Sequence, residues 1–318
     1  MQEQEMDKVE NHRKKGKTIH IIKLILRLLL GGMFITTAIL KLLSIDQFEL
    51  YIYSFGIFNY LWCTFFARCI IAFEFLLGFC LIIKFYYKYT WWATMATLIG
   101  FTLFLVYVAI FRNDSNCHCF GDFVELNPIN SIIKNLITII LLLFIRKEPD
   151  YKFRFKNLIV GLYFAATVTV CFILFPMDAI YNQIKSPIKE VNLEVFEKIQ
   201  TDSTFTADFD DGKYIVPVFI PTCKYCKLSM KKLNSIVESR EIDKSRINIF
   251  IIGDNQYIEK FKEEVEIEEY TFTLINIKDI MDLVNGKFPT FLFLENGKIK
   301  KAVDFRGLTE KEILDFIQ

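Results

Sequence analysis

The sequence carries almost no net charge, with 38 Lys and Arg against 37 Asp and Glu. It therefore lacks the basic excess that is typical of nucleic-acid-binding proteins. Pro and Gly are also scarce, at 7 and 13 of 318 residues, which excludes a collagen-like chain or a Pro/Gly-rich disordered one. Residues 181–318 contain no His and only two Cys, so this region lacks the ligands of an ordinary structural zinc site.

Charged residues are unevenly distributed between the two halves of the chain. Residues 19–145 are about 11% charged, whereas residues 181–318 are about 32% charged. The first region has the composition of membrane spans, and the second that of a water-soluble domain. Five apolar segments predict spans, and the first is too long for a cleavable signal peptide. They are Ile21–Leu43, Leu61–Ile83, Thr90–Phe111, Ser131–Ile145 and Asn157–Met177.

Lys and Arg alternate between the connections of these spans. They occur before the first span, between the second and third, and at residues 146–156, but not in residues 44–60 or 113–130. Basic connections stay in the cytoplasm. We therefore expect a multi-pass protein of the bacterial inner (cytoplasmic) membrane, embedded in the lipid bilayer, with a cytoplasmic N-terminus. Five spans then place the soluble domain outside, in the periplasm or at the cell exterior, where disulfides form.

The soluble region alternates strand and helix patterns. Strands are expected at residues 204–209, 214–220, 247–252, 290–294 and 298–305, and helices at residues 226–238, 256–266, 277–284 and from Thr309. Strands interleaved with helices predict an α/β sandwich. A polar stretch that contains Ser186-Pro187 predicts a linker at residues 181–189.

The motif Cys223-Lys224-Tyr225-Cys226 follows a predicted strand and opens a predicted helix. A thiol at a helix N-terminus lies near unpaired N–H groups and the positive end of the helix dipole, which favour its thiolate. The spacing places the second sulfur about one helical turn away. We therefore expect a redox-active pair, with Cys223 as the exposed nucleophile and Cys226 as the buried resolving thiol. Metal binding or inert packing is the alternative.

A second proline motif, Lys287-Phe288-Pro289-Thr290, precedes a predicted strand and an Asn-Gly hairpin. Together with the cysteine motif, it makes residues 190–318 resemble a thioredoxin-like domain. The resemblance implies a cis bond before Pro289 and substrate binding by Phe288, Pro289 and Thr290, with no cofactor bound to this domain. Two positions depart from the family. Thr222 replaces the usual tryptophan, and Pro217 stands where many thioredoxins keep a buried acid.

The motif Cys117-His118-Cys119 lies in the connection before the fourth span. Two cysteines one residue apart close a small, strained ring, and strain makes a disulfide more oxidising. His118 could supply a positive field or a proton route. A zinc site that recruits Cys63, or incidental loop thiols, are the alternatives. The other cysteines, Cys69, Cys80 and Cys171 with Cys63, lie within apolar spans, where small hydrophobic residues fill the core.

Further matches extend through residues 20–145. They include Arg27, Gly31–Phe34, Lys41–Leu43, Phe48-Glu49, Glu74–Gly78, Phe101-Thr102 and Cys117–Gly121. On these residues the region resembles the methylamine-utilisation MauE family, a branch of the DoxX-like four-helix membrane proteins. The resemblance implies a role in making or maturing disulfides in exported proteins. A looser likeness to quinone-linked disulfide-forming enzymes would add a quinone in the membrane domain.

Two ionisable residues lie deep within predicted spans. Glu74 is near the middle of the second span, where an isolated charge costs at least about 2.5–3.5 kcal/mol. Arg27, in the first span, could pair with it. Such a pair would either lock the bundle or handle protons or quinone. Lys41 and Arg68 lie nearer the outer face, where we expect them to be interfacial.

Five segments follow from these patterns. They are a cytoplasmic tail (1–19), a DoxX/MauE-like four-helix membrane domain (20–145), a basic loop with a fifth span (146–180), a linker (181–189) and a thioredoxin-like domain (190–318). Their combination predicts a membrane-anchored thiol–disulfide oxidoreductase that acts on cysteine-containing exported proteins. Cys117 and Cys119 would relay electrons to or from Cys223 and Cys226, and strain in the loop pair favours oxidation of clients.

Two other functions remain open from the sequence. The chain could be a non-catalytic membrane maturation or assembly factor for an exported enzyme. By analogy with DoxX proteins, it could instead be a quinone-linked sulfur oxidoreductase.

Overall fold

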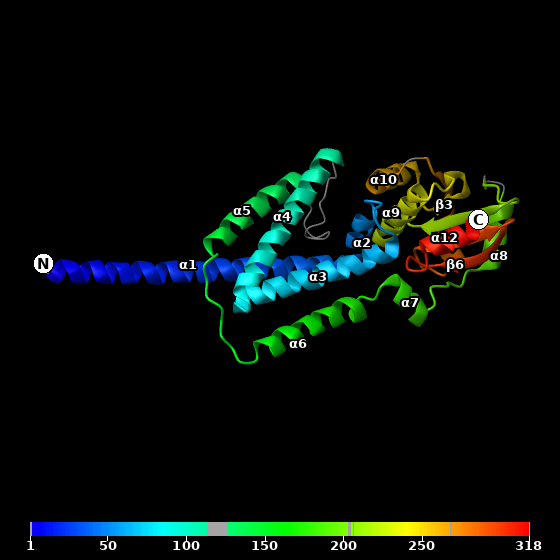
Figure 1. The fold of residues 1–318 in the computed structure, drawn as a ribbon. Coiled ribbons are helices and arrows are strands. Elements are labelled where there is room, and N and C mark those ends of the chain that lie inside the picture. Colours follow the sequence, from blue (N-terminus) through cyan, green and yellow to red (C-terminus); the bar gives the residue numbers. More distant parts are fainter. Residues whose placement is uncertain (1, 113–125, 203–204, 206, 268, 318) are drawn as a thin grey trace. The chain divides into compact units, whose positions relative to one another are not determined.

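The structure of the protein is a computed structural model. It describes residues 2–112, 126–202, 205, 207–267 and 269–317, with side chains from residue 17 onward, so Cys117, His118 and Cys119 lie outside the described residues. The chain divides into two compact units. A helical unit comprises Met1–Ile52 and Trp62–Pro176, and a sheet unit comprises Tyr53–Leu61 and Met177–Gln318 (Figure 1).

Long apolar helices form the helical unit. They are α1 (Gln2–Leu43), α2 (Ile45–Tyr53), α3 (Tyr60–Ile83), α4 (Tyr87–Phe111), α5 (Pro128–Phe144) and α6 (Lys156–Thr169), which continues as the π-helical turn η1 (Val170–Leu174). Within the described ranges, four helical segments are long and apolar enough to cross a membrane, namely Lys17–Leu43, Tyr60–Ile83, Tyr87–Phe111 and Lys156–Leu174. The chain is therefore a multi-pass membrane protein.

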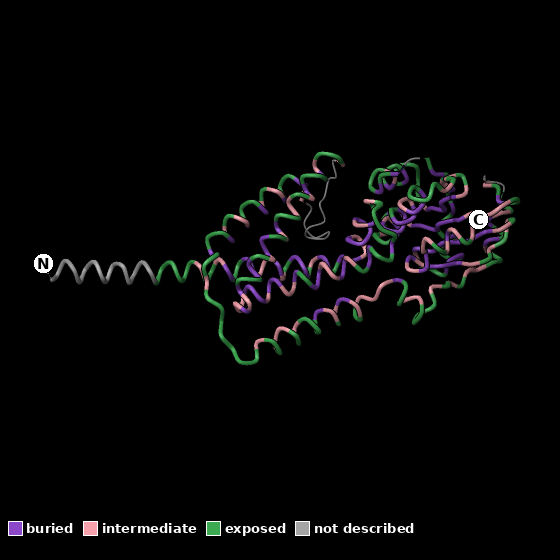
Figure 2. The backbone as a smooth tube through the Cα atoms, viewed as in Figure 1, coloured by how far each residue is buried: buried purple, intermediate pink, exposed green. Residues whose placement is uncertain are grey.

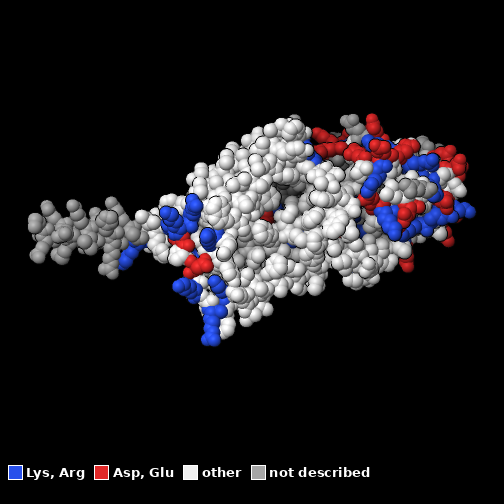
Figure 3. All heavy atoms as spheres, viewed as in Figure 1, with Lys and Arg blue, Asp and Glu red and all other residues white. Residues whose placement is uncertain are grey.

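The surface of the helical unit fits a lipid environment. Large apolar side chains such as Leu29, Leu103 and Ile140 are exposed, as lipid-facing residues are. Charged residues are almost absent from the face drawn in Figure 3 except at one end of this unit, whereas the sheet unit carries many. Helix α5 has 17 residues, below the roughly 20 of a full span. Helix α2 forms where the sequence predicted only a connection.

Close helix packing and hydrogen bonds from side chains to backbone carbonyls hold the helices together. A Cβ added at Gly31 would lie 2.8 Å from the carbonyl oxygen of Gly78, so these glycines let α1 and α3 approach closely. The Trp91 indole donates to the carbonyl of Leu142 at 2.8 Å, and the Tyr87 hydroxyl donates to that of Ile145 at 2.7 Å. These aromatic residues of α4 satisfy carbonyls at the end of α5 that have no partner within the helix.

The sheet unit is built on five strands in the order β4-β3-β2-β5-β6. Their bounds are β2 (Lys213–Phe219), β3 (Asn248–Ile251), β4 (Thr271–Leu274), β5 (Thr290–Glu295) and β6 (Lys298–Val303). Strands β2, β3 and β4 are parallel, and β5 is antiparallel to both β2 and β6. The helices are α7 (Asp178–Ile184), α8 (Leu193–Thr201), α9 (Lys224–Ser239), η2 (Lys244–Arg246), α10 (Asn255–Val265), α11 (Ile277–Leu283) and α12 (Glu310–Ile317).

Alternating side chains of β2 and β5 build a core on each face of the sheet. Val216 and Val218 join a cluster that includes Phe196 of α8 and Leu283 of α11. On the other face, Phe219 packs against Phe261 of α10. The central strands are consequently buried along most of their length (Figure 2). The predicted α/β sandwich is confirmed.

One local prediction is wrong. Residues 205 and 207–209 form no strand, because the strand that follows them, β2, already pairs with β3 on one side and β5 on the other. The predicted linker, residues 181–189, begins within α7, and Ile188 then pairs with Val303 as an isolated bridge on the outer edge of β6. An edge strand leaves backbone groups unpaired, and this segment satisfies some of them.

Candidate functional site

The Cys223–Cys226 motif lies where β2 passes into α9. The strand ends at Phe219, and Cys223 occupies the position that caps the N-terminus of α9. The Cys223 sulfur accepts a hydrogen bond from the backbone N–H of Cys226 at 3.4 Å. The first N–H groups of a helix have no partner within it, so the Cys223 sulfur satisfies one of them.

The two cysteines differ in exposure. Cys223 is partly exposed, whereas Cys226 is fully buried. Burial raises the pKa of the Cys226 thiol far above its usual range, and the neighbouring Cys223 adds to this effect, although a hydrogen bond with the backbone of Ile220 opposes it. Both residues are free thiols in the structure. The arrangement gives one accessible sulfur that can attack and one buried sulfur that can only act on a partner brought to it.

The proline motif lies at the same end of the sheet. Val218 pairs with Thr290 in the antiparallel β2–β5 ladder. Pro289, the residue before Thr290, therefore lies beside the end of β2, close to the start of the cysteine motif. The Phe288–Pro289 bond is cis. Phe288 is half-buried, but Thr290 is fully buried and its hydroxyl donates to the carbonyl of Lys287 at 2.6 Å. The side chain of Thr290 is therefore not presented to a ligand.

Among the described residues, no acid influences the Cys226 thiol. Pro217 is buried in β2 opposite Phe291. Asp178 is the one buried carboxylate among the residues of the sheet unit that the structure describes. Ser229, one helical turn beyond Cys226, is fully buried, and its hydroxyl has no hydrogen-bond partner within the described part of the chain. The Cys226 thiol therefore lies in a buried environment, one helical turn from the Ser229 hydroxyl.

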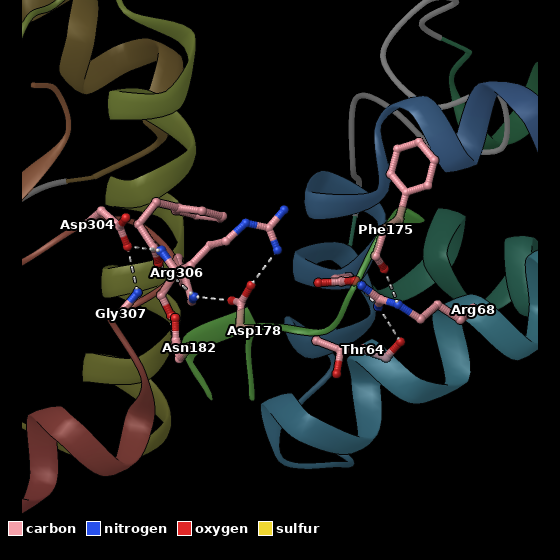
Figure 4. Close-up of polar contacts among 11 residues, drawn as sticks. Thr64, Arg68, Phe175, Asp178, Asn182, Asp304, Arg306 and Gly307 are labelled. Carbon is pink, nitrogen blue, oxygen red and sulfur yellow. Dashed lines mark hydrogen bonds and ion pairs between the residues drawn. The ribbon is translucent and has the colours of Figure 1, made fainter. Parts of the chain in front are cut away.

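A buried charged cluster supports the loop beside this motif. The Lys232 ammonium group donates to Asp178 at 2.9 Å and to the carbonyl of Phe305 at 3.1 Å, and its side chain is fully buried. The second oxygen of Asp178 accepts from Arg306 at 3.0 Å (Figure 4). The Phe305 ring lies edge-on to Tyr225, the residue between the cysteines, with centroids 6.2 Å apart. The cluster thus links α7 to the rim of the cysteine motif.

Residues 53–61 belong to the sheet unit and contact helix α9. The Tyr60 ring lies 4.5 Å from the Lys232 ammonium, which also lies 4.5 Å from the Phe305 ring. The Tyr53 hydroxyl and the Ser239 hydroxyl are 3.0 Å apart. Sequence reasoning missed Lys232 as a structural residue, because the sequence does not distinguish it from Lys231, which is exposed.

In the helical unit, Glu74 pairs with Lys41 of α1 instead of the expected Arg27. Both partners are buried, and the Lys41 ammonium lies 5.2 Å from the Phe101 ring. Arg27 precedes Lys41 by 14 residues, about 21 Å along a helix, so only one of them can reach Glu74. One Glu74 oxygen and the Arg27 Nε atom have no hydrogen-bond partner among the described residues.

Arg68 is likewise buried within the helical unit. Its guanidinium pairs with Glu49 and donates to the carbonyls of Thr64 at 2.7 Å and Phe175 at 2.9 Å (Figure 4). Lys41 and Arg68, which the sequence predicted to be interfacial, are both buried, and each has a buried carboxylate partner. An unpaired charge within the bilayer is costly, so a buried carboxylate attracts the nearest cation.

Comparison with known proteins identifies the membrane region. Residues 19–146 match the family model of methylamine utilisation protein MauE. The predicted resemblance is confirmed for this MauE-like region, which contains Lys41, Glu74 and Arg68. Across most of its length, the chain is also similar to Protein TlpB of Flavobacterium psychrophilum, with 25% identity over 342 residues, 90% of this chain and 92% of that protein.

A solved structure is similar to part of the chain. The thioredoxin domain of a thiol-disulfide oxidoreductase from Bacteroides vulgatus is 16% identical, with a TM-score of 0.28. The similarity covers 35% of this chain and 83% of that domain.

Proposed function

We propose that this protein is a membrane-anchored thiol–disulfide oxidoreductase whose clients are cysteine-containing proteins. The observation that carries the proposal is the pairing of a partly exposed, helix-capping Cys223 with a fully buried Cys226. An exposed thiolate forms the mixed disulfide with a client, and the buried thiol releases it.

The reaction balances between two couples. In the oxidising direction, a client thiolate attacks the Cys223–Cys226 disulfide at the Cys223 sulfur and displaces the Cys226 thiolate. The second client thiol then attacks the client sulfur of the mixed disulfide, which leaves a client disulfide and two protein thiols. The reducing direction runs the same steps in reverse. Strain in a Cys117–Cys119 disulfide would favour oxidation.

A trapping experiment tests the proposal. The Cys226→Ser variant should accumulate mixed disulfides through Cys223, seen as high-mass species that dithiothreitol removes. The Cys223→Ser variant is the matched control and should accumulate none. Equal adduct levels in the two variants would contradict the proposal.

We further propose that Cys117 and Cys119 regenerate this couple within one chain. A Cys223–Cys117 mixed disulfide would pass two electrons between the pairs, and a membrane carrier such as a quinone would take up two electrons and two protons. The Cys226→Ser, Cys119→Ser double variant would hold this linkage for detection by mass spectrometry. Its absence under both oxidising and reducing growth would rule out the relay while leaving the client reaction intact.

For the orientation, we propose a cytoplasmic N-terminus and an extracytoplasmic sheet unit in a bacterial inner membrane. The alternation of basic and acidic connections supports this assignment. A membrane-impermeant maleimide should label Cys223 in intact cells of the Cys226→Ser variant. Labelling only after the cells are opened would overturn it.

A further inference from the structure

The helical unit contains an open cleft between α3, the start of α4 and α6. Its volume is about 390 Å³, and its lining residues are Leu76, Tyr86, Asn157, Val160, Gly161 and Phe164. The residues from α6 recur every three or four positions, so they form one face of that helix. Tyr86 and Asn157 make one end of the cleft polar, where the Tyr86 hydroxyl donates to the Asn157 side chain. The rest of the lining is apolar.

Gly161 keeps the cleft open. A Cβ atom added there would meet no atom within 4 Å, whereas one added at Gly31 would collide with α3. Gly31 therefore serves close helix packing, and Gly161 does not. Glycine is unfavourable in a helix compared with Ala. At this position it leaves space beside α6 that a larger side chain would occupy.

A cation without a carboxylate partner among the described residues lies at the polar end of the cleft. The Lys156 ammonium lies 4.5 Å from the Tyr86 ring centroid. Among the described residues, no acid lies within ion-pair distance of it. Glu148, the nearest acid along the preceding connection with Asp150, is already paired with Lys84 at 2.6 Å and Lys23 at 3.6 Å. Basic side chains gather at this end of the helical unit, with a few acidic ones beside them (Figure 3).

We propose that this cleft binds one anionic phospholipid. Its phosphate lies at Lys156, and an acyl chain runs along Val160, Gly161 and Phe164. Bulk lipid is as apolar as the cleft, so burial of the chain gives little preference for this site. Selectivity therefore comes from the cation at the mouth and from the space at Gly161. Basic pockets between membrane helices recognise anionic head groups in this way.

Native mass spectrometry of the full chain in a neutral detergent tests the proposal. The probes are phosphatidylglycerol and phosphatidylcholine with identical acyl chains. We expect one phosphatidylglycerol to remain bound with at least fivefold higher occupancy than phosphatidylcholine. The Lys156→Gln variant should lower phosphatidylglycerol occupancy to the phosphatidylcholine level. The Gly161→Leu variant should remove both lipids.

Matched controls separate the cleft from general effects. Lys17→Gln removes a basic residue from α1, and Gly32→Leu fills another position where an added Cβ meets no atom within 4 Å. Both should retain wild-type lipid occupancy. If Gly161→Leu does not fold, Gly161→Ala should still lower occupancy.

Other outcomes would overturn the proposal. They are unchanged occupancy in both Lys156→Gln and the folded Gly161 variant, or equal binding of the two lipids. Displacement of phosphatidylglycerol by millimolar inorganic phosphate alone would identify a phosphate site instead. Cross-linked dimers that disappear in the Gly161 variant would identify a second copy of the chain as the occupant.

Discussion

The sulfur of Cys223 caps its own helix by accepting the backbone N–H of Cys226 at 3.4 Å. Cys223 thus provides the acceptor and Cys226 the donor. The Cys223 side chain is partly exposed, whereas the Cys226 side chain is fully buried. This relationship makes the two thiols chemically unequal before any client binds, and it directs attack to Cys223.

Alkylation should reveal this inequality. In the reduced Cys226→Ser variant, iodoacetamide should modify Cys223. In the Cys223→Ser variant, it should modify Cys226 at least tenfold more slowly at pH 8, because burial raises the pKa of that thiol and keeps it protonated. Peptide mass spectrometry separates these sites from the other cysteines. Similar rates in the two variants would contradict the assignment of nucleophile and resolving thiol.

The buried thiol also predicts a pH dependence of stability. The folded pKa of Cys226 lies above that of the unfolded thiol, so the folded state binds more protons once the pH exceeds about 8.5. Stability from this group is complete below that pH and falls by about 1.4 kcal/mol per pH unit above it. The free energy of unfolding of the reduced chain, measured at pH 8 and pH 10, should fall less in Cys226→Ala. Tyr270, whose pKa burial also raises, is present in both chains, so their difference isolates Cys226.

Features set by local sequence could be predicted well. The helix expected at residues 226–238 forms as α9 (Lys224–Ser239). The Thr309 hydroxyl accepts the N–H of Glu312 at the start of α12, as the capping pattern predicts. Asn296 and Gly297 both have positive φ angles in the β5–β6 hairpin, which is the conformation that Asn-Gly turns favour. Each of these depends on residues a few positions apart.

Features that depend on contacts between residues far apart in the sequence could not be predicted. The pattern of residues 204–209 favours a strand, but the strand that follows it in the sequence, β2, is already paired on both sides with β3 and β5. Glu74 required a cation, and the sequence favoured Arg27, whereas Lys41 is the residue that pairs with it. Lys232 and Asp178 are 54 residues apart, and neither carries a local signal of their ion pair.

The Lys41–Glu74 pair should be strongly coupled. Either Lys41→Met or Glu74→Leu leaves one buried charge without its partner, which should lower the free energy of unfolding by about 3–5 kcal/mol. The double variant should lie within about 1 kcal/mol of the wild type, because well-packed apolar residues can replace a buried pair. Denaturation of the full chain in micelles measures all four proteins. Additive losses in the double variant would show that the two side chains do not act as a pair.

The Lys232 cluster should hold residues 181–189 in place. Lys232→Met removes a donor from Asp178 and from the Phe305 carbonyl, so it should destabilise the sheet unit by about 3 kcal/mol. Trypsin should then cleave at Lys185 and Lys189 several-fold faster under native conditions. The Lys231→Met variant, changed at the exposed neighbouring position, should be cleaved by trypsin at the wild-type rate. Wild-type cleavage in Lys232→Met would mean that the cluster does not restrain this segment.

Substitution of Ser229, whose buried hydroxyl has no hydrogen-bond partner among the described residues, should instead increase stability. A buried polar group without a hydrogen bond costs about 1–3 kcal/mol, so Ser229→Ala should raise the free energy of unfolding by about 1 kcal/mol after the lost packing is deducted. The comparison needs a matched control, and Ser235→Ala provides one on the same helix, because the Ser235 hydroxyl is exposed and donates to the Lys231 carbonyl. That substitution should change stability by no more than about 0.5 kcal/mol. Two results together would contradict this prediction: Ser229→Ala destabilises the chain, and it also changes the thiol reactivity of Cys226. The Ser229 hydroxyl would then have a hydrogen-bond partner in solution, and that partner would be the Cys226 sulfur, one helical turn away.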